Sequence, residues 1–259
     1  MREWLEYFEW NKANRRLIPW AQEPRIGFLL QKPLIRSLQR FQVGENGEGS
    51  HLRKQAATTG CPIYQKCIDL FIKEEQEHAR LMAEVLKREG APLLKHHWTD
   101  NCFVLLRRLF RLEHELLVLL VPEIIAKRYF RALRDGTEDP VLRAMCEQIL
   151  HDEEGHVAFH VDYLRQNFRR LSLFKRMAVM VGWKLLFQAA CVVVILDHHS
   201  LLRAVGVSAG TFWWDCLMLL DEAAAAIFSS VSERRDLWVS ALAADRANKA
   251  QGVRAISTA

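Results

Sequence analysis

Two short motifs of the form Glu-x-x-His could hold a metal ion. Glu75 and His78 make the first motif, and Glu153 and His156 make the second. Residues three apart lie on one face of a helix, so each pair can direct a carboxylate oxygen and an imidazole nitrogen to one point. A carboxylate on an otherwise apolar helix face is costly to bury without a partner, and a cation would supply one. One such pair alone would be weak, because charged helices contain them by chance.

Two upstream glutamates repeat with the same spacing as these motifs. Glu45 precedes Glu75 by the same interval as Glu123 precedes Glu153. One constant difference in residue number therefore relates the whole second set to the first, and we call it the repeat shift. Apolar residues also coincide under this shift: Leu34 with Leu112, Leu38 with Leu116, Phe41 with Leu119, and Leu81 with Phe159. Two helical hairpins of equal build, packed as a pseudo-twofold pair, would bring four glutamates and two histidines together.

The predicted metal ligands are therefore six side chains that surround two cations. Oxygen-rich coordination with one imidazole per metal suits iron, or alternatively manganese, better than a sulfur-seeking ion. The predicted set is Glu45, Glu75, His78, Glu123, Glu153 and His156.

Some ligand choices have competitors. Glu48 lies on the same predicted helix face as Glu45, but the repeat shift favours Glu45 because it relates Glu48 to Ala126, which cannot bind a metal. His160, one turn beyond His156, is an additional candidate, either as a nitrogen ligand or as a residue that orients a ligand. Its competing interpretation is a packed core histidine, which we favour. The other acids beside the motifs are interpreted as solvated surface residues: Glu74, Glu77, Asp152 and Glu154.

Glu123 also has competitors, Glu113 and Glu115, in the same predicted helix. We favour Glu123 because it interrupts a run of apolar residues, where a carboxylate has no simple structural explanation. Pro122 precedes it and removes one backbone hydrogen bond, a distortion tolerated where a functional residue must be aimed.

Helical periodicity dominates the chain, and no useful stretch alternates as a strand would. The sequence predicts an all-α fold. Glycine and proline pairs mark the helix ends, and Asp139 followed by Pro140 resembles a helix start. The predicted helices cover residues 33–58, 62–90, 100–134, 140–168, 173–203, 211–230 and 232–250. We expect an aromatic N-terminal arm over 1–32, a metal-binding bundle over 33–168, and a C-terminal helical extension over 169–259 packed on the bundle.

Composition limits the classes of protein that this chain can belong to. It has 259 residues, half of them hydrophobic and 26% charged, which is ordinary for a globular protein. The net charge of +5 comes from scattered Lys and Arg, so we expect no nucleic-acid partner. The six cysteines form no C-x-x-C pair, which indicates free buried thiols in a reducing compartment. The N-terminus is too charged for a signal peptide, so the expected location is cytoplasmic.

The segment 177–196 is almost entirely apolar and long enough to span a membrane. Lys184 interrupts it, and a lysine in the middle of a span costs about 3 kcal/mol. We therefore favour a buried bundle helix over membrane association through this segment.

The two motif regions resemble the paired metal-binding helices of the ferritin-like di-iron carboxylate superfamily. The stretches that carry the likeness are Lys73-Glu74-Glu75-Gln76-Glu77-His78-Ala79 and His151-Asp152-Glu153-Glu154-Gly155-His156. That superfamily includes rubrerythrins, bacterioferritins, the ribonucleotide reductase small subunit, multicomponent monooxygenases, acyl carrier protein desaturases and aryl-amine N-oxygenases. The resemblance covers residues 33–168 and implies a four-helix bundle with a long crossover between its second and third helices. It also implies one half-site from Glu45, Glu75 and His78, and another from Glu123, Glu153 and His156. The chain lacks the paired cysteines of a rubredoxin domain, and residues 169–259 have no counterpart in minimal ferritins.

From the predicted site we expect an oxidoreductase that uses two irons to activate oxygen and oxidise an organic substrate, as a hydroxylase, N-oxygenase or desaturase does. The apolar C-terminal region would wall a pocket for a small, apolar substrate, and an external electron donor would reduce the metals. The alternatives are peroxide scavenging or iron handling, and a non-enzymatic helical protein that docks to a membrane or a partner. The oligomeric state stays open.

Overall fold

The structure, a computed structural model, describes residues 1–97, 105 and 111–228, and these residues form helices and connections without a strand. This confirms the predicted all-α class. The helices are α1 (Arg2–Ala13), α2 (Phe28–Glu45), α3 (Ser50–Ala57), α4 (Pro62–Arg88), α6 (Leu112–Asp135), α7 (Pro140–Phe168), α8 (Leu173–Ala204) and α9 (Ala209–Phe228).

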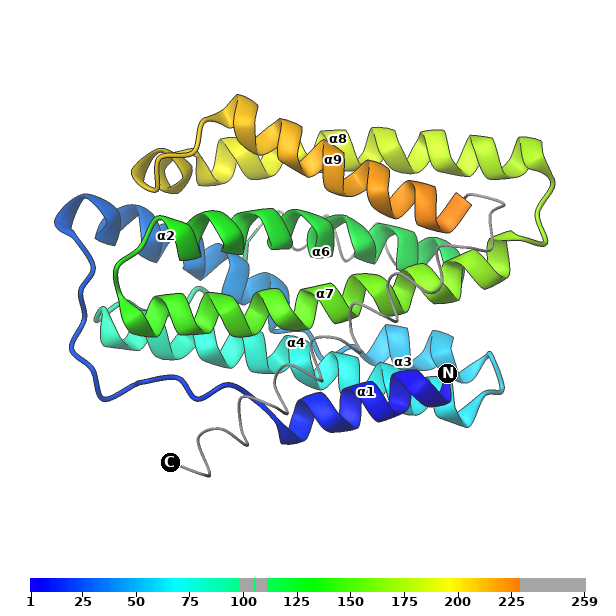
Figure 1. Cartoon of the computed structure of the whole chain (residues 1–259), viewed down its shortest axis with the longest axis horizontal. Helices are drawn as coiled ribbons and strands as arrows, with labels where there is room; N and C mark the ends of the chain where they lie inside the picture. Colours follow the sequence, from blue (N-terminus) through cyan, green and yellow to red (C-terminus); the bar gives the residue numbers. More distant parts are fainter. Residues whose placement is uncertain (98–104, 106–110, 229–259) are drawn as a thin grey trace, which may run out of the picture.

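The long helices α2, α4, α6 and α7 surround the centre of the molecule (Figure 1). Helix α6 packs along α7, α2 packs along α4, and α4 also contacts α7. Helices α8 and α9 cover one side, where α8 lies on α2 and α6 while α9 lies on α6 and α7. Helix α1 lies on α4 at the opposite side of the molecule (Figure 1). The central helices are thus enclosed from two sides by elements from the two ends of the described chain.

Two predicted helices are interrupted in the structure. The helix predicted over 33–58 is wrong as a single element, because α2 ends at Glu45 and α3 begins at Ser50. Gly49, just before α3, has a φ of 64°, a left-handed conformation that glycine adopts readily. The helix predicted over 100–134 is wrong as a single element, because Arg111 has an extended backbone and α6 begins at Leu112; residues 98–104 and 106–110 lie outside the described residues. The spacing of apolar residues does not reveal the break after Glu45, because α3 continues the same spacing.

Other predicted helix boundaries are confirmed. Helix α7 begins with Pro140, and the Asp139 carboxylate accepts a 2.7 Å hydrogen bond from the backbone N–H of Leu142. Gly136 caps the end of α6. The predicted start at Asp100 and the predicted helix over 232–250 lie outside the described residues. The described cysteines are free, as predicted: Cys61, Cys67, Cys146, Cys191 and Cys216.

Helix α1 docks through a close contact between Tyr7 and Gly155. A Cβ atom at Gly155 would lie 2.5 Å from Cζ of Tyr7, so only glycine leaves room for the ring against the backbone of α7. Trp4 reinforces the contact by donating a 3.1 Å hydrogen bond from its indole to Asp162. The predicted N-terminal arm is therefore a helix seated directly behind the second Glu-x-x-His motif.

Helix α8 differs from the buried bundle helix that we favoured. It is the one described helix that is long and apolar enough to cross a membrane, with a mean hydropathy of 2.2 over an 18-residue window. Only 17% of that window is buried. The buried side chains, among them Trp183, Phe187 and Cys191, face α2, α6 and α9, and the other side of the helix is exposed.

A buried polar chain joins α2, α6 and α8. The Ser37 hydroxyl lies 2.5 Å from the Tyr129 hydroxyl and 2.6 Å from Nδ1 of His198. Burial lowers the pKa of His198 to about 3, and the nearby positive charges of Arg40 and His97 act in the same direction. The folded protein therefore keeps His198 neutral at a pH where an unfolded histidine is protonated.

This difference predicts that His198 contributes to acid destabilisation. Between the unfolded pKa of 6.5 and the folded value of about 3, only the unfolded state binds the proton, so stability falls as pH falls. The contribution is about 1.4 kcal/mol per pH unit. His198→Gln should remove that part of the slope when the free energy of urea unfolding is measured from pH 6.5 to pH 4. His199→Gln, at the exposed neighbour, is the control, and an equal slope in wild type and His198→Gln would contradict the assignment.

Candidate metal centre

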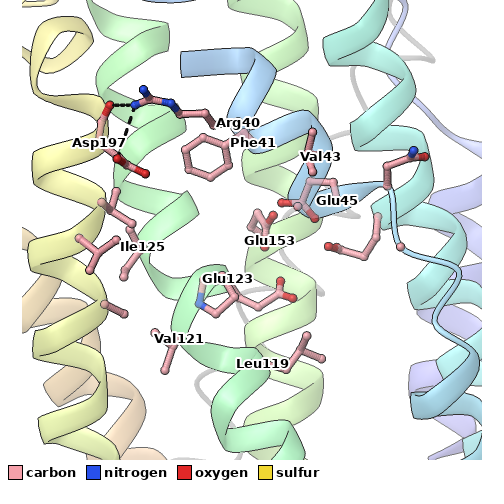
Figure 2. A pocket seen from close by; sticks show the side chains of 18 of the residues that line it. Arg40, Phe41, Val43, Glu45, Leu119, Val121, Glu123, Ile125, Glu153 and Asp197 are labelled. Atoms are coloured by element: carbon pink, nitrogen blue, oxygen red, sulfur yellow. Dashed lines mark hydrogen bonds and ion pairs between the residues drawn. The ribbon is translucent and has the colours of Figure 1, made fainter. Parts of the chain in front are cut away.

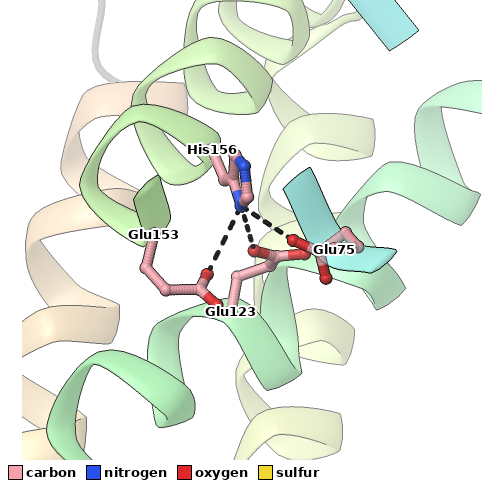
Figure 3. Close-up of side chains that lie close together, drawn as sticks. All are labelled: Glu75, Glu123, Glu153 and His156. Carbon is pink, nitrogen blue, oxygen red and sulfur yellow. Dashed lines mark ion pairs between the residues drawn. The ribbon is translucent and has the colours of Figure 1, made fainter. Parts of the chain in front are cut away.

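The six predicted ligand side chains converge in the interior between the central helices. They come from α2 (Glu45), α4 (Glu75 and His78), α6 (Glu123) and α7 (Glu153 and His156). Their potential ligand atoms form two overlapping groups, each with all atoms within 4.8 Å of one another: Glu75, Glu123, Glu153 and His156 in the first, and Glu45, Glu75 and His78 in the second. Figure 3 shows the first group, with its carboxylates directed toward the His156 ring. Glu75 belongs to both groups, so the two positions adjoin.

Several buried atoms of this cluster lack a hydrogen-bond partner among the described residues. Nδ1 of His156 lies 2.9 Å from Glu75, 3.4 Å from Glu123 and 3.7 Å from Glu153, in each case from a carboxylate oxygen. Buried polar atoms are nearly always hydrogen-bonded, and leaving one unpaired costs about 1–3 kcal/mol. The atoms that make no hydrogen bond are Oε1 of Glu75, Nδ1 of His78, Oε2 of Glu123, Oε2 of Glu153 and Nδ1 of His156, although the first and the last form an ion pair. Since these atoms belong to the two ligand groups, cations at the two positions would satisfy them.

The other nitrogen of each imidazole contacts an acid from the opposite motif. Nε2 of His78, in α4, lies 2.9 Å from Asp152 in α7, and Nε2 of His156, in α7, lies 2.9 Å from Glu74 in α4. A carboxylate at this position fixes the ring orientation and leaves Nδ1 free to bind a metal. These contacts fit histidines that serve as metal ligands.

Glu74 and Asp152 were therefore misassigned as solvated acids, because both are buried. A signal in the sequence could have identified them. Glu74 precedes Glu75 and Asp152 precedes Glu153, so the two acids are themselves related by the repeat shift. The motif that repeats is thus a pair of adjacent acids followed by a histidine.

Helix α1 and the residues after it bind both of these acids. The Asn11 side-chain amide donates hydrogen bonds of 2.7 Å to Glu74 and 2.8 Å to Asp152, and so bridges them. Arg15 donates to Asp152 at 2.8 Å and lies 3.8 Å from Glu74. Gln148, one turn before Asp152 in α7, donates a further 2.9 Å hydrogen bond to it. The predicted N-terminal arm therefore supplies a cation and an amide that fix the acids behind the histidines.

Burial and mutual repulsion shift the pKa values of the central glutamates. Burial raises the pKa of Glu45 well above its usual value, as does the charge of Glu75. Burial and the charge of Glu123 likewise raise the pKa values of Glu75 and Glu153. Burial also acts to raise the pKa of Glu123, but Glu153 and His156 outweigh it and lower that pKa to about 2. Since metal ligands bind in their deprotonated form, cation binding would displace the protons that this cluster retains.

The two histidines of α7 have opposite electrostatic environments. Burial acts to lower the pKa of His156, but the surrounding carboxylates, Glu75 foremost, raise it well above its usual value. Burial lowers the pKa of His160 to about 4, so that ring is neutral. His160 belongs to neither group of potential ligands among the described residues, and it packs edge-on against Phe71. Its placement matches the core histidine that we favoured over a third nitrogen ligand.

The competing glutamates lie elsewhere. Glu48 is exposed in the connection between α2 and α3, outside both ligand groups, so the structure places Glu45 rather than Glu48 in the cluster. Glu115 is buried near the start of α6 and lies 3.0 Å from Nδ1 of His51. Pro122 lies inside α6, immediately before Glu123, and the helix continues past it.

A cavity of about 480 Å³ reaches the carboxylates from the side of α2 and α8. In Figure 2, Arg40 and Asp197 lie at the upper end, and Glu123 and Glu153 lie nearer the middle of the view. Between them the wall is mainly apolar, with side chains from α2, α6 and α8: Phe41, Val121, Ile125, Leu186, Ala190 and Val194. The predicted C-terminal extension therefore does line a pocket beside the cluster.

The contact between His78 and Asp152 predicts that Asp152 controls metal affinity without binding the metal itself. Asp152→Asn keeps the size of the side chain but removes its charge. We expect it to weaken metal binding roughly 10–100-fold, measured by competition with a chelator of known affinity. Glu154→Gln, at an exposed position two residues away, is the matched control and should bind as wild type does. Unchanged affinity in a folded Asp152→Asn protein would contradict the role that we assign to Asp152.

Comparisons with known proteins do not assign this chain to a family. No protein-family model matches the sequence, and no curated protein matches it significantly. The geometry described above therefore carries the functional argument.

Proposed function

We propose that this protein is a di-iron oxidoreductase of the ferritin-like type, which uses oxygen to oxidise an organic substrate. The single observation that carries the proposal is the convergence of four glutamates and two histidines, in which several buried ligand atoms make no hydrogen bond among the described residues. Helices α2, α4, α6 and α7 each contribute to the cluster, with a Glu-x-x-His pair on two of them, as in ferritin-like metal sites. Carboxylate oxygens with one imidazole per metal suit iron, and manganese is the alternative.

The predicted ligands would bind the two cations as two sets of three residues. Glu45, Glu75 and His78 would hold one cation, and Glu123, Glu153 and His156 the other, with Glu75 close enough to both groups to bridge them. Two ferrous ions held together would supply the electrons that reduce oxygen. Glu74 and Asp152 would keep the imidazole rings oriented toward the metals.

The cavity supports an organic substrate over simple iron handling. Its wall is mostly aliphatic and aromatic, and Glu123 and Glu153 also line it, so an apolar molecule could lie beside the metals. Iron storage or peroxide removal would need no such space.

Metal analysis tests the ligand set. Wild-type protein should bind about two irons per chain, while Glu75→Ala and Glu153→Ala should each lose most of that iron. Glu48→Ala is the matched control, because Glu48 is an exposed glutamate outside the cluster. Elemental analysis of protein loaded with ferrous iron without oxygen gives the result. A wild-type protein that binds no iron or manganese, or a Glu48→Ala variant as depleted as Glu75→Ala, would refute the assignment.

Oxygen uptake tests the reaction class. Ferrous-loaded wild-type protein should consume oxygen in proportion to its bound iron, while Glu75→Ala, with no complete cluster, should not. An oxygen electrode and a parallel assay of hydrogen peroxide distinguish oxygen activation from peroxide scavenging. Rapid consumption of peroxide with little uptake of oxygen would favour a peroxide scavenger instead.

A further inference from the structure

Exposed apolar side chains gather on one face of α8. They recur at intervals of three, four or seven residues after Phe174, so they share one side of the helix. We call this surface the α8 face; it consists of Leu173, Phe174, Met177, Val181, Leu185, Val192 and Leu196. Phe174 is 82% exposed and Leu173 is 69% exposed. Contiguous apolar surface of this kind on a soluble protein usually marks a binding site for a partner or a membrane.

The packing of α8 argues against a membrane span. Its opposite side lies against α2, α6 and α9, where the Trp183 indole donates a 2.7 Å hydrogen bond to the carbonyl of Leu117. Lys184 forms a 2.6 Å ion pair with Asp221 of α9. A helix that crossed the bilayer would carry these polar neighbours into the hydrocarbon, which is costly. The α8 face can therefore meet a membrane only by lying along its surface.

The charged residues near the α8 face indicate which kind of partner surface it would bind. Residues 169–204 contain six basic side chains and a single acid, Asp197, which pairs with Arg40. Exposed basic residues stand at both ends of the helix: Arg169, Arg170 and Lys175 at the start, and Arg203 at the end. Apolar side chains flanked by basic ones suit an anionic phospholipid surface. A second copy of the chain would place basic ends against basic ends in either orientation.

We propose that the α8 face binds the surface of an anionic phospholipid bilayer, with Phe174 and Met177 inserted between the lipids. The basic residues at the two ends of the helix contact the lipid phosphates. This inference needs no metal and stands apart from the proposed oxidation chemistry.

The position of the cavity links membrane binding through α8 to the proposed function. Ala189 of α8 is exposed, and it also lines the cavity. Its neighbours Leu186 and Val193 line the cavity too. A protein that lies on the bilayer through this helix therefore holds its apolar cavity beside the lipid. If the proposed function is correct, the substrate is an apolar molecule drawn from the membrane.

Co-sedimentation of the purified full chain with vesicles tests the docking. The protein should bind vesicles of phosphatidylcholine mixed with phosphatidylglycerol far better than vesicles of phosphatidylcholine alone. The paired change Arg170→Gln with Lys175→Gln should lower the partition coefficient on the order of tenfold. The pair Phe174→Gln with Met177→Gln should lower it by a similar factor, because two apolar anchors are lost. Leu17→Gln is the control, at a residue that is 96% exposed but far along the chain from α8.

Specific outcomes would overturn the proposal. One is the absence of binding to the anionic vesicles, and another is equal loss of binding in Leu17→Gln and in the α8 variants. Light scattering that shows a dimer, dissociated by Phe174→Gln with Met177→Gln, would make a second copy the occupant of the α8 face. Binding that appears only after residues 229–259 are removed would make that segment the occupant. Vesicle binding does not depend on iron content, so its failure is distinguishable from failure of the proposed function.

Discussion

Carboxylates crowded inside an apolar core are the constraint on which this structure depends. Four glutamates lie together with two further acids behind them, and isolated buried charges of this number would not be tolerated. Partial compensation comes from His78 and His156, and from Asn11 and Arg15 at the rear. The compensation is incomplete, because ligand atoms at the centre remain unpaired among the described residues. A protein that gives up stability to keep such a centre is expected to use it.

The outer helices serve this centre in different ways. Helix α1 covers one side and stabilises the acids that hold the imidazoles, and the close fit of Tyr7 against Gly155 sets its position. Helix α8 covers the other side and walls the cavity that reaches Glu123 and Glu153. One end of the described chain thus contacts the acids behind the predicted ligands, and the other lines the cavity that reaches them.

Sequence periodicity and the repeat shift predicted the all-α class, most helices and the convergence of six side chains. The repeat succeeded because the two hairpins bring equivalent residues to the same interior cluster. It could have identified Glu74 and Asp152, but an acid beside a ligand looks solvated until its burial is known. The break after Glu45 escaped prediction because α3 keeps the same apolar period. The exposure of α8 escaped because composition measures how apolar a helix is and not which neighbours cover it.

The crossed contacts of the histidines have a consequence for folding. The acid that orients His78 belongs to α7, and the acid that orients His156 belongs to α4. Neither hairpin alone can set the geometry of its own imidazole. Affinity for a metal at this centre would therefore arise late, when both halves of the chain have met, and a nascent or half-folded molecule would hold the metal only loosely.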